Sequence, residues 1–250
     1  MGLVHIGTYR NGKNIKEVIT GTQLKKVATT MSIDRATSIA AILTAVCPKY
    51  GINTADILHE FLSNLLHECG EFTRFSEGLN YQAEALVMKF GRHRISVDDC
   101  YRYGRIRIKN ANGTYSIRPA NQQMIANLIY GGQWGLENLG NKQQGDGWLM
   151  RGAGPIQLTG RANITAFANY YNKLMGTSIT PEAMADLLRT NIEIGIHGSA
   201  WFFAVYKGLI DEAIDDKFLY IVKKINGGTI GFSERTHYYE LCKKYIPIAA

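Results

Sequence analysis

The segment ADILHEFLSNLLHEC, residues 55–69, carries the clearest structural signal in the chain. Its apolar side chains recur at the three- and four-residue spacing of an amphipathic helix. They are Ile57, Leu58, Phe61, Leu62, Leu65 and Leu66. Thr54 stands where a helix N-cap is expected, and Gly70 stands where a helix commonly ends. The pattern therefore predicts a helix over 55–69 with an apolar face.

Helical periodicity recurs through most of the remaining sequence. Further helices are predicted over 34–47, 81–90, 120–130, 161–175, 181–188, 192–206 and 210–225. Alternating apolar and polar residues over 105–108 and 114–117 flank a Lys-Asn-Ala-Asn-Gly turn and predict one β-hairpin. The glycine-rich region 131–160 is expected to be a long ordered loop. No repeat or linker marks a boundary, so the sequence predicts a mainly α, single globular domain with one small hairpin.

The composition is that of an ordinary folded protein with a basic balance. Of the 250 residues, 46% are apolar and 20% are charged, which excludes disordered and collagen-like chains. A formal net charge of +7 favours an acidic partner such as nucleic acid, an anionic membrane or an anionic cell wall. One local basic cluster is formed by Arg102, Arg105, Arg107 and Lys109. Nothing resembles a recognition helix, so no nucleic-acid partner is expected.

The start of the chain and its cysteines bear on the compartment. No apolar run approaches the roughly 18 to 20 residues that span a bilayer, so no stable membrane insertion is expected. The first residues, MGLVHIGTYRNGKNIKEV, contain no apolar signal-peptide core and no small-residue cleavage site. We therefore expect a protein that stays in a bacterial cytoplasm unless a separate factor releases it. The cysteines are widely spaced and are expected to be free thiols; they are Cys47, Cys69, Cys100 and Cys242.

Two glutamates near the end of the 55–69 helix could supply acid–base chemistry. Glu68 lies about 70° from the centre of the apolar stripe, in the last helical turn. Partial burial and the negative end of the helix dipole both disfavour its ionised form, as a general acid requires. Glu77 would lie about 13–14 Å away on the opposite face if the helix continued. Gly70 and residues 76–78 indicate that the chain folds back instead.

That reversal would allow the two carboxylates to face each other across a cleft, as in a glycosidase. The same residues also fit a structural interpretation, with Glu68 as a partly buried salt-bridge partner and Glu77 as an ordinary loop carboxylate. Spacing alone leaves both interpretations open.

Three motifs occur in the order found in a known enzyme family. The first combines HECG (67–70) with EGLNY (77–81), the second is GDGWLMRGAGPIQLTGRAN (145–163), and the third combines INGG (225–228) with Arg235. Together they resemble glycoside hydrolase family 19, which contains plant-type chitinases and the single-domain endolysins of bacteriophages.

The resemblance runs from about Thr22 to Tyr245 and is closest to the endolysin branch. It implies a mainly α-helical, lysozyme-like fold, with residues 1–21 as an N-terminal extension and residues 22–250 as the catalytic domain. The hairpin region 101–119 looks like an addition to the family core.

The resemblance also implies roles for individual residues. Glu68 would be the general acid and Glu77 the general base in the hydrolysis of a β-1,4 glycosidic bond. Six further residues would bind substrate or water: Tyr81, Gln157, Thr159, Asn163, Asn226 and Arg235.

Within that set, Gln157, Thr159 and Asn163 would hold the attacking water and the N-acetyl group. Asn226 and Arg235 would line the far wall of the cleft and orient the acid. Read without the resemblance, Thr159 is also a helix N-cap, and Asn226-Gly227-Gly228 is also a helix end followed by a turn.

The sequence departs from the family pattern at three positions. Cys69 stands where Ser or Thr is usual, Gly78 where Asn is frequent, and Ala153 where many members have Arg. The first two changes bear on substrate preference more than on proton transfer. The third removes a cation near the cleft, and with it any contact to an acidic substituent.

The expected function is that of an endolysin that cleaves peptidoglycan glycan strands with inversion of configuration, as a monomer and without metal or cofactor. A chitinase acting on N-acetylglucosamine polymers is the alternative within the family. A wall amidase or peptidase with Cys69 as nucleophile and a non-catalytic wall-binding protein are the alternatives from other classes. His67 and Cys69 point about 200° apart on a helix, which is a poor nucleophile–base geometry. A zinc peptidase is not expected, because position 71 is Glu and not the second His of an H-E-x-x-H motif.

Overall fold

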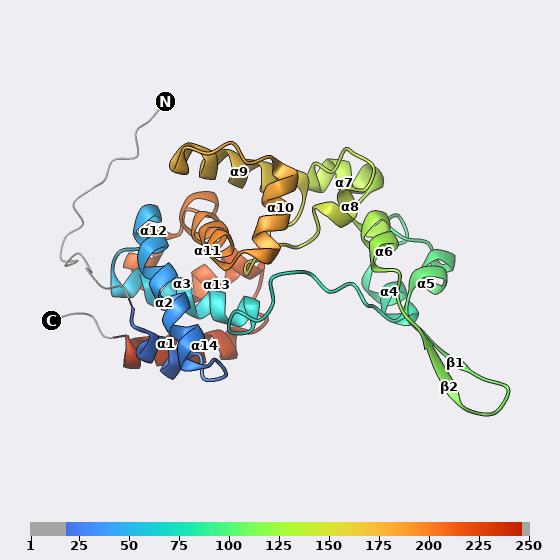
Figure 1. Ribbon diagram of the computed structural model, residues 1–250, viewed down its shortest axis with the longest axis horizontal. Helices are drawn as coiled ribbons and strands as arrows, with labels where there is room; N and C mark the ends of the chain where they lie inside the picture. The colour runs from blue at the N-terminus through green and yellow to red at the C-terminus, as the bar shows by residue number, and fades with distance from the viewer. Residues whose placement is uncertain (1–18, 247–250) are drawn as a thin grey trace. The chain divides into compact units, whose positions relative to one another are not determined.

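The computed structural model describes residues 19–246, and its contacts group the chain into two compact units (Figure 1). The first unit comprises the chain up to Glu71 and from Ala200 onward, and the second comprises Phe72–Ser199. Both units are mainly helical, and the described residues contain one two-stranded sheet. The predicted mainly α class with one small β-hairpin is therefore confirmed. Most of the predicted N-terminal extension, residues 1–18, lies outside the described residues.

Helix α3, Ala55–Cys69, is the central element of the first unit and confirms the prediction at both ends. The Thr54 hydroxyl accepts a hydrogen bond from the backbone N–H of Ile57, and Gly70 ends the helix with a φ of 55°. The helix is buried on nearly all sides and not along one face, and even Glu60 in its middle is fully buried. Its ends approach solvent, with Asp56 exposed in the first turn and His67 and Glu68 partly exposed in the last.

Helix α14, Phe232–Tyr245, packs along α3, and helix α1, Gly21–Val27, packs against both α14 and α2. The other elements of this unit are α2 (Ile33–Val46), η1 (Cys47–Tyr50), η2 (Phe202–Tyr206), α12 (Ile210–Ile214) and α13 (Phe218–Asn226). Helices α1 and α14 were not predicted. The first is short and is fixed by a capping box between Thr20 and Gln23, and the second buries few of its side chains.

Two predicted helices are interrupted in the structure. The prediction over 192–206 covers α11, Ile192–Trp201, and then the π-helical turn η2. The prediction over 210–225 covers α12 and α13, which are separated where Asp216 adopts a φ of 55°. A non-glycine residue in this conformation breaks the helical backbone, and Tyr239 holds it there by a hydrogen bond to the Asp216 carboxylate.

The second unit contains the predicted hairpin and most of the remaining helices. Strands β1 (Ile106–Lys109) and β2 (Tyr115–Arg118) pair antiparallel, one residue later than predicted. The helices are α4 (Ala83–Lys89), α5 (Val97–Tyr103), α6 (Gln122–Ile129), α7 (Gly132–Leu139), α8 (Asp146–Leu149), α9 (Arg161–Met175), α10 (Pro181–Thr190) and most of α11. Leu79, Leu86, Phe90, Ile125 and Ile129 lie in one core cluster beneath α4, α5 and α6.

The prediction of a long loop over 131–160 is wrong, because helices α7 and α8 lie within it. The segment is ordered by a buried ion pair between Arg161 and Asp146, with Nη2 and Oδ1 2.6 Å apart. The Asp146 carboxylate also accepts hydrogen bonds from the backbone N–H groups of Lys142 and Gln143. Burial opposes the charge, but the hydrogen bonds from Arg161 and Gln143 hold the pKa of Asp146 below its usual value.

Candidate active site

Glu68 and Arg235 are brought together in the first unit. Glu68 lies in the last turn of α3 with 24% of its side chain exposed, at the margin of the core as its position on the helix predicts. Arg235, on α14, is 1% exposed and forms an ion pair with Glu68 Oε1. The same guanidinium donates a 3.0 Å hydrogen bond to Asn64 Oδ1 one turn earlier on α3. The Glu68 carboxyl is thereby fixed in orientation by a buried cation.

This ion pair changes the expected electrostatics of Glu68. Position on the helix alone predicts a carboxyl at the margin of the core, whereas the structure adds a buried guanidinium in direct contact with it. Sequence periodicity could not reveal this contact, because Arg235 comes from a helix 167 residues further along the chain.

The loop between α13 and α14 packs against the last turn of α3. Gly231 has a φ of 71°, and a Cβ atom placed on it would come within 2.4 Å of His67 Nε2. A larger residue at this position would be strained in its backbone and would displace the His67 ring. Helix α13 ends at Asn226 with Gly227 in the left-handed conformation, which confirms the predicted helix end. The Asn226 amide donates a 3.0 Å hydrogen bond to the carbonyl of Ile230 and so closes the loop on itself.

The chain leaves α3 through an unusual reversal, which confirms the predicted break in the helix. Gly70 and Glu71 both have positive φ, 55° and 53°. Glu71 is held there because its carboxylate accepts hydrogen bonds from the Thr30 backbone N–H (2.8 Å), the Thr30 hydroxyl and the Tyr238 hydroxyl (3.0 Å). These contacts fix the backbone that immediately follows the turn bearing Glu68.

Glu77 lies in the second unit, where its carboxylate has two hydrogen-bond donors. The Tyr130 hydroxyl donates to Oε1 at 2.6 Å, and the Gly152 backbone N–H donates to Oε2 at 3.1 Å. The backbone N–H of Glu77 donates in turn to the Gly152 carbonyl at 3.0 Å. An isolated antiparallel bridge pairs the adjacent Ser76 with Ala153. Glu77 is therefore held by the backbone of the GAGPIQL segment on one side and by a phenol on the other.

Gln157 lies beside Glu77 across Gly152. A Cβ atom on Gly152 would come within 2.5 Å of Gln157 Oε1 and 3.1 Å of Glu77 Cβ, so a larger residue here would displace the Gln157 amide. Gln157 itself has a φ of 57°, and its amide donates to the Gly154 carbonyl at 2.9 Å. The structure thus brings the carboxylate and the amide together around one glycine.

Thr159 and Asn163 follow this cluster along the chain. The prediction that Thr159 caps a helix is wrong: α9 begins after Gly160, and the Thr159 hydroxyl donates to the Gln157 carbonyl at 3.0 Å. Asn163 then donates from its side-chain amide to the Thr159 carbonyl at 2.9 Å. Both side chains hold the backbone that presents Gln157.

Tyr81 makes a different set of contacts. Its hydroxyl accepts a 2.7 Å hydrogen bond from Lys89 Nζ, and its ring packs edge-on against Phe90 at 5.7 Å.

Glu77 has three neighbours that the sequence did not identify, which are Arg94, Arg151 and Tyr130. Burial lowers the pKa values of Arg94 and Arg151, and the negative charge of Glu77 opposes this in both cases. Arg94 stacks on Trp134 at 3.7 Å, and Arg151 stacks on Trp148 at 3.6 Å. Burial first, and then the charge of Glu77, raise the pKa of Tyr130, so its hydroxyl remains a proton donor.

The cysteines are free and buried in the structure, as predicted for free thiols. Cys69 is 0% exposed, and its Sγ donates to the Leu65 carbonyl at 2.9 Å. A thiol in this position packs inside the helix bundle and does not present a nucleophile at the surface.

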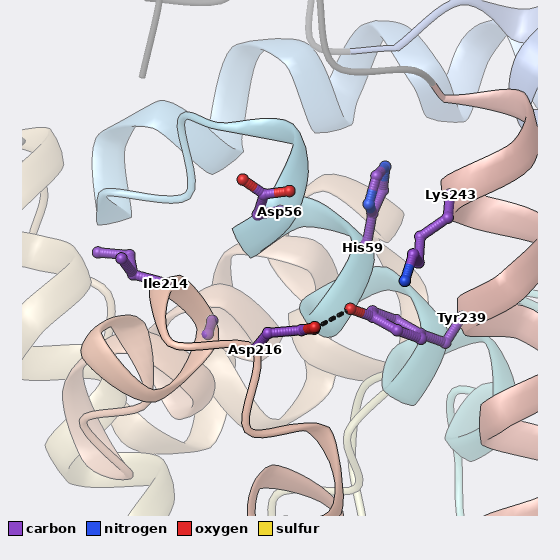
Figure 2. A pocket seen from close by; sticks show the side chains of 7 residues that line it. Asp56, His59, Ile214, Asp216, Tyr239 and Lys243 are labelled. Atoms are coloured by element: carbon purple, nitrogen blue, oxygen red, sulfur yellow. Dashed lines mark hydrogen bonds between the residues drawn. The ribbon is translucent and has the colours of Figure 1, made fainter. Parts of the chain in front are cut away.

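A separate pocket of about 470 Å³ lies in the first unit near the start of α3 (Figure 2). Its polar lining is formed by Asp56, His59, Asp216, Tyr239 and Lys243, and Figure 2 shows the Tyr239 hydroxyl bonded to the Asp216 carboxylate. None of the predicted site residues lines it.

Over residues 19–246, no cluster of three or more His, Cys, Asp or Glu side chains is arranged to hold a metal ion. No helix in the same range is long and apolar enough to cross a membrane.

Comparison with known proteins identifies the family. No protein-family profile matches the chain. The chain is 31% identical over 179 residues to a glycosyl hydrolase family 19 domain-containing protein of Haemophilus influenzae, covering 72% of this chain and 74% of that protein. Its structure is similar to the crystal structure of a chitinase C mutant, with a TM-score of 0.55 and 14% identity over 95% of this chain and 97% of that one. This likeness confirms the predicted lysozyme-like fold. The chain belongs to glycoside hydrolase family 19.

Proposed function

We propose that this glycoside hydrolase is an endolysin that cleaves β-1,4 glycosidic bonds of bacterial peptidoglycan by a single displacement. Glu68 would protonate the glycosidic oxygen as general acid, and Glu77 would take a proton from the attacking water as general base. The observation that supports this most strongly is the Glu77 carboxylate, which is held by Tyr130 and Gly152 beside the amide of Gln157.

The surroundings of Glu77 suit a base that is in place before substrate arrives. The two hydrogen bonds from Tyr130 and Gly152 fix the direction of the carboxylate lone pairs, which reduces the reorganisation needed during the reaction. The Gln157 amide, which lies with Glu77 around Gly152, would orient a water molecule against that carboxylate. Thr159 and Asn163 support the backbone behind it.

The surroundings of Glu68 suit an acid whose conjugate base must be stabilised. As the proton leaves for the glycosidic oxygen, a carboxylate forms directly against the Arg235 guanidinium. Charge that develops during the transfer is therefore met by a buried cation already in position. Asn64 holds the same guanidinium from the other side.

Peptidoglycan is preferred over chitin as substrate on electrostatic grounds. Both polymers contain β-1,4-linked N-acetylglucosamine, but peptidoglycan carries carboxylates and chitin is neutral. A chain with a formal net charge of +7 is attracted to the anionic polymer. We further infer that the protein acts as a monomer and reaches the wall from a bacterial cytoplasm through a separate release factor of the holin kind.

The test is to incubate the purified protein with purified peptidoglycan and, separately, with colloidal chitin. The products are then identified by mass spectrometry of their new reducing ends. We expect soluble muropeptides with a newly formed reducing sugar. Release of chitin oligosaccharides alone would identify a chitinase, and cleavage of an amide bond with intact glycan strands would identify an amidase. Either result would overturn the proposal.

A further inference from the structure

The β1–β2 hairpin extends from a firmly held base in the second unit (Figure 1). An isolated parallel bridge joins Gln82 to Arg105, with hydrogen bonds from the Arg105 N–H to the Tyr81 carbonyl (2.8 Å) and from the Ala83 N–H to the Arg105 carbonyl (3.2 Å). On the other strand, the Arg118 guanidinium donates to the Gly104 carbonyl at 3.0 Å. The hairpin therefore has a fixed origin next to the start of α4.

All charged residues in the segment that contains the hairpin are cations. From Cys100 to Leu136 the sequence contains no Asp or Glu. The same segment contains five cations, which are Arg102, Arg105, Arg107, Lys109 and Arg118. A continuous region of one charge sign attracts ligands of the opposite sign.

One face of the hairpin combines charge with apolar surface. Arg107 pairs with Ile117 and Lys109 pairs with Tyr115 across the two strands, so these four side chains lie on one face. The Arg107 guanidinium lies 3.8 Å above the Tyr115 ring. Ile117 and Tyr115 remain 66% and 53% exposed. This face is open to a partner.

A groove of about 420 Å³ lies at the base of this face. Its lining combines two guanidinium groups, one carboxylate, one amide and two branched aliphatic side chains: Gln82, Glu84, Arg105, Ile106, Arg107 and Ile117. Guanidinium groups bind carboxylates through paired hydrogen bonds, and a single carboxylate binds an ammonium group. The set fits a short peptide with free carboxylates, an amino group and small apolar side chains. It does not resemble a site for a neutral sugar.

The groove is close to Glu77 along the chain. Gln82, which lines the groove, is five positions after Glu77, so their Cα atoms are at most about 18 Å apart. Both residues belong to the second unit. A glycan strand bound at Glu77 could therefore place a short side-chain peptide in the groove.

We propose that this groove binds the acidic peptide side chains of peptidoglycan, and that Arg105 and Arg107 are the residues that select a peptide-bearing strand. This inference rests on the proposed function, because it assigns a second recognition element to the same substrate. It gives the hairpin a role in specificity and none in proton transfer.

The test compares R105Q/R107Q with a matched control, K49Q/K173Q, which removes the same charge from exposed lysines on η1 and α9. The substrates are soluble glycan strands that carry their peptides and the same strands after an amidase has removed the peptides. We expect R105Q/R107Q to lower kcat/KM about tenfold on peptide-bearing strands, through KM, because charge-assisted hydrogen bonds are lost. We expect a change within about twofold on stripped strands and for the control.

An equal loss on both substrates, or no loss on either, would overturn the proposal. Circular dichroism of R105Q/R107Q checks that the variant folds, and if it does not, the single R107Q on the exposed face of β1 replaces it. For R107Q we expect a smaller loss of kcat/KM, again on peptide-bearing strands and not on stripped strands.

Binding of a purified peptide side chain to the wild-type protein, measured by calorimetry, separates this inference from the proposed function. Peptide binding that depends on the two arginines, without cleavage of either glycan, would support the groove and contradict the endolysin proposal. Cleavage of peptide-bearing and stripped strands at equal rates, without peptide binding, would support the endolysin proposal and contradict the groove. Arginine-dependent binding to phosphatidylglycerol vesicles or duplex DNA, with no binding of the peptide, would overturn the proposed partner.

Discussion

The hydroxyl of Tyr130, the residue that follows helix α6, donates a 2.6 Å hydrogen bond to Oε1 of Glu77, 53 residues earlier in the chain. Burial and the charge of Glu77 raise the pKa of Tyr130, so its hydroxyl keeps its proton. The phenol therefore cannot itself accept the proton that a general base must take. It acts instead as a fixed donor that orients the carboxylate.

Replacing Tyr130 by Phe should lower kcat by about tenfold and leave KM within about twofold, because a hydrogen bond to a charged group is lost without loss of the ring. The rate of reducing-end release from peptidoglycan measures this. Tyr220→Phe, on the exposed side of α13, is the matched control and should keep the wild-type rate. Full activity of Y130F would show that the orientation of Glu77 does not depend on this bond.

Arg235 should be required in its exact form and not only as a positive charge. Its planar guanidinium reaches Glu68 and Asn64 at once, a geometry that an ammonium group cannot reproduce. We expect R235Q to lower kcat by about 10² and R235K to recover only part of that loss. Circular dichroism confirms folding. If R235K equals the wild type, simultaneous contact with Glu68 and Asn64 is unimportant and only the charge matters.

Glu60 should make the stability of the protein depend on pH. It is 0% exposed, and among the described residues neither carboxyl oxygen has a hydrogen-bond partner. Burial, and then the charge of Asp216, raise its pKa to about 8, while Lys243 opposes this. An unfolded chain releases the same proton near pH 4.3.

Between about pH 4.5 and pH 8 the folded protein therefore retains a proton that the unfolded chain has lost. The free energy of unfolding should fall across this window as pH rises, by about 1.4 kcal/mol per pH unit from this group. Urea denaturation at several pH values measures the slope for the wild type and for E60Q. The free energy of unfolding of the wild type minus that of E60Q should fall as pH rises. A difference that does not change with pH would show that Glu60 does not have a raised pKa.

The elements that the sequence could predict are those whose signal is local. The stripe of α3, its Thr54 cap and its Gly70 terminus are all encoded within 17 residues, and the structure has the helix at the predicted bounds. The hairpin follows in the same way from alternation around a glycine-containing turn.

Elements held by distant contacts could not be predicted. Helix α7 lies in a glycine-rich stretch, and the nearby backbone is fixed by Arg161 and Asp146, which are 15 residues apart. Thr159 has the residue type of an N-cap, but its hydroxyl is engaged by the Gln157 carbonyl and Gly160 takes the position before the helix. The partners of the two glutamates, Arg235 in α14 and Tyr130 at the end of α6, come from far along the chain.

The stereochemical course of hydrolysis should be inversion. In the proposed mechanism Glu77 activates a water and forms no bond to the sugar, so a β-1,4 linkage should give the α-anomer first. Proton nuclear magnetic resonance on a short soluble oligosaccharide, recorded before mutarotation, distinguishes the anomers. Initial appearance of the β-anomer or a trapped glycosyl-enzyme would show that Glu77 is a nucleophile.

If Glu68 and Glu77 are the acid and the base of one reaction, both must be essential for cleavage. The decisive measurement is the initial rate of reducing-end release from purified peptidoglycan by E68Q and by E77Q. Each substitution should lower the rate by about 10² to 10⁴ with an unchanged circular dichroism spectrum, because each removes a proton-transfer group of nearly the same size. E240Q, at an exposed position on α14, serves as the control and should match the wild type. A rate near that of the wild type for either E68Q or E77Q would show that this glutamate transfers no proton in the reaction.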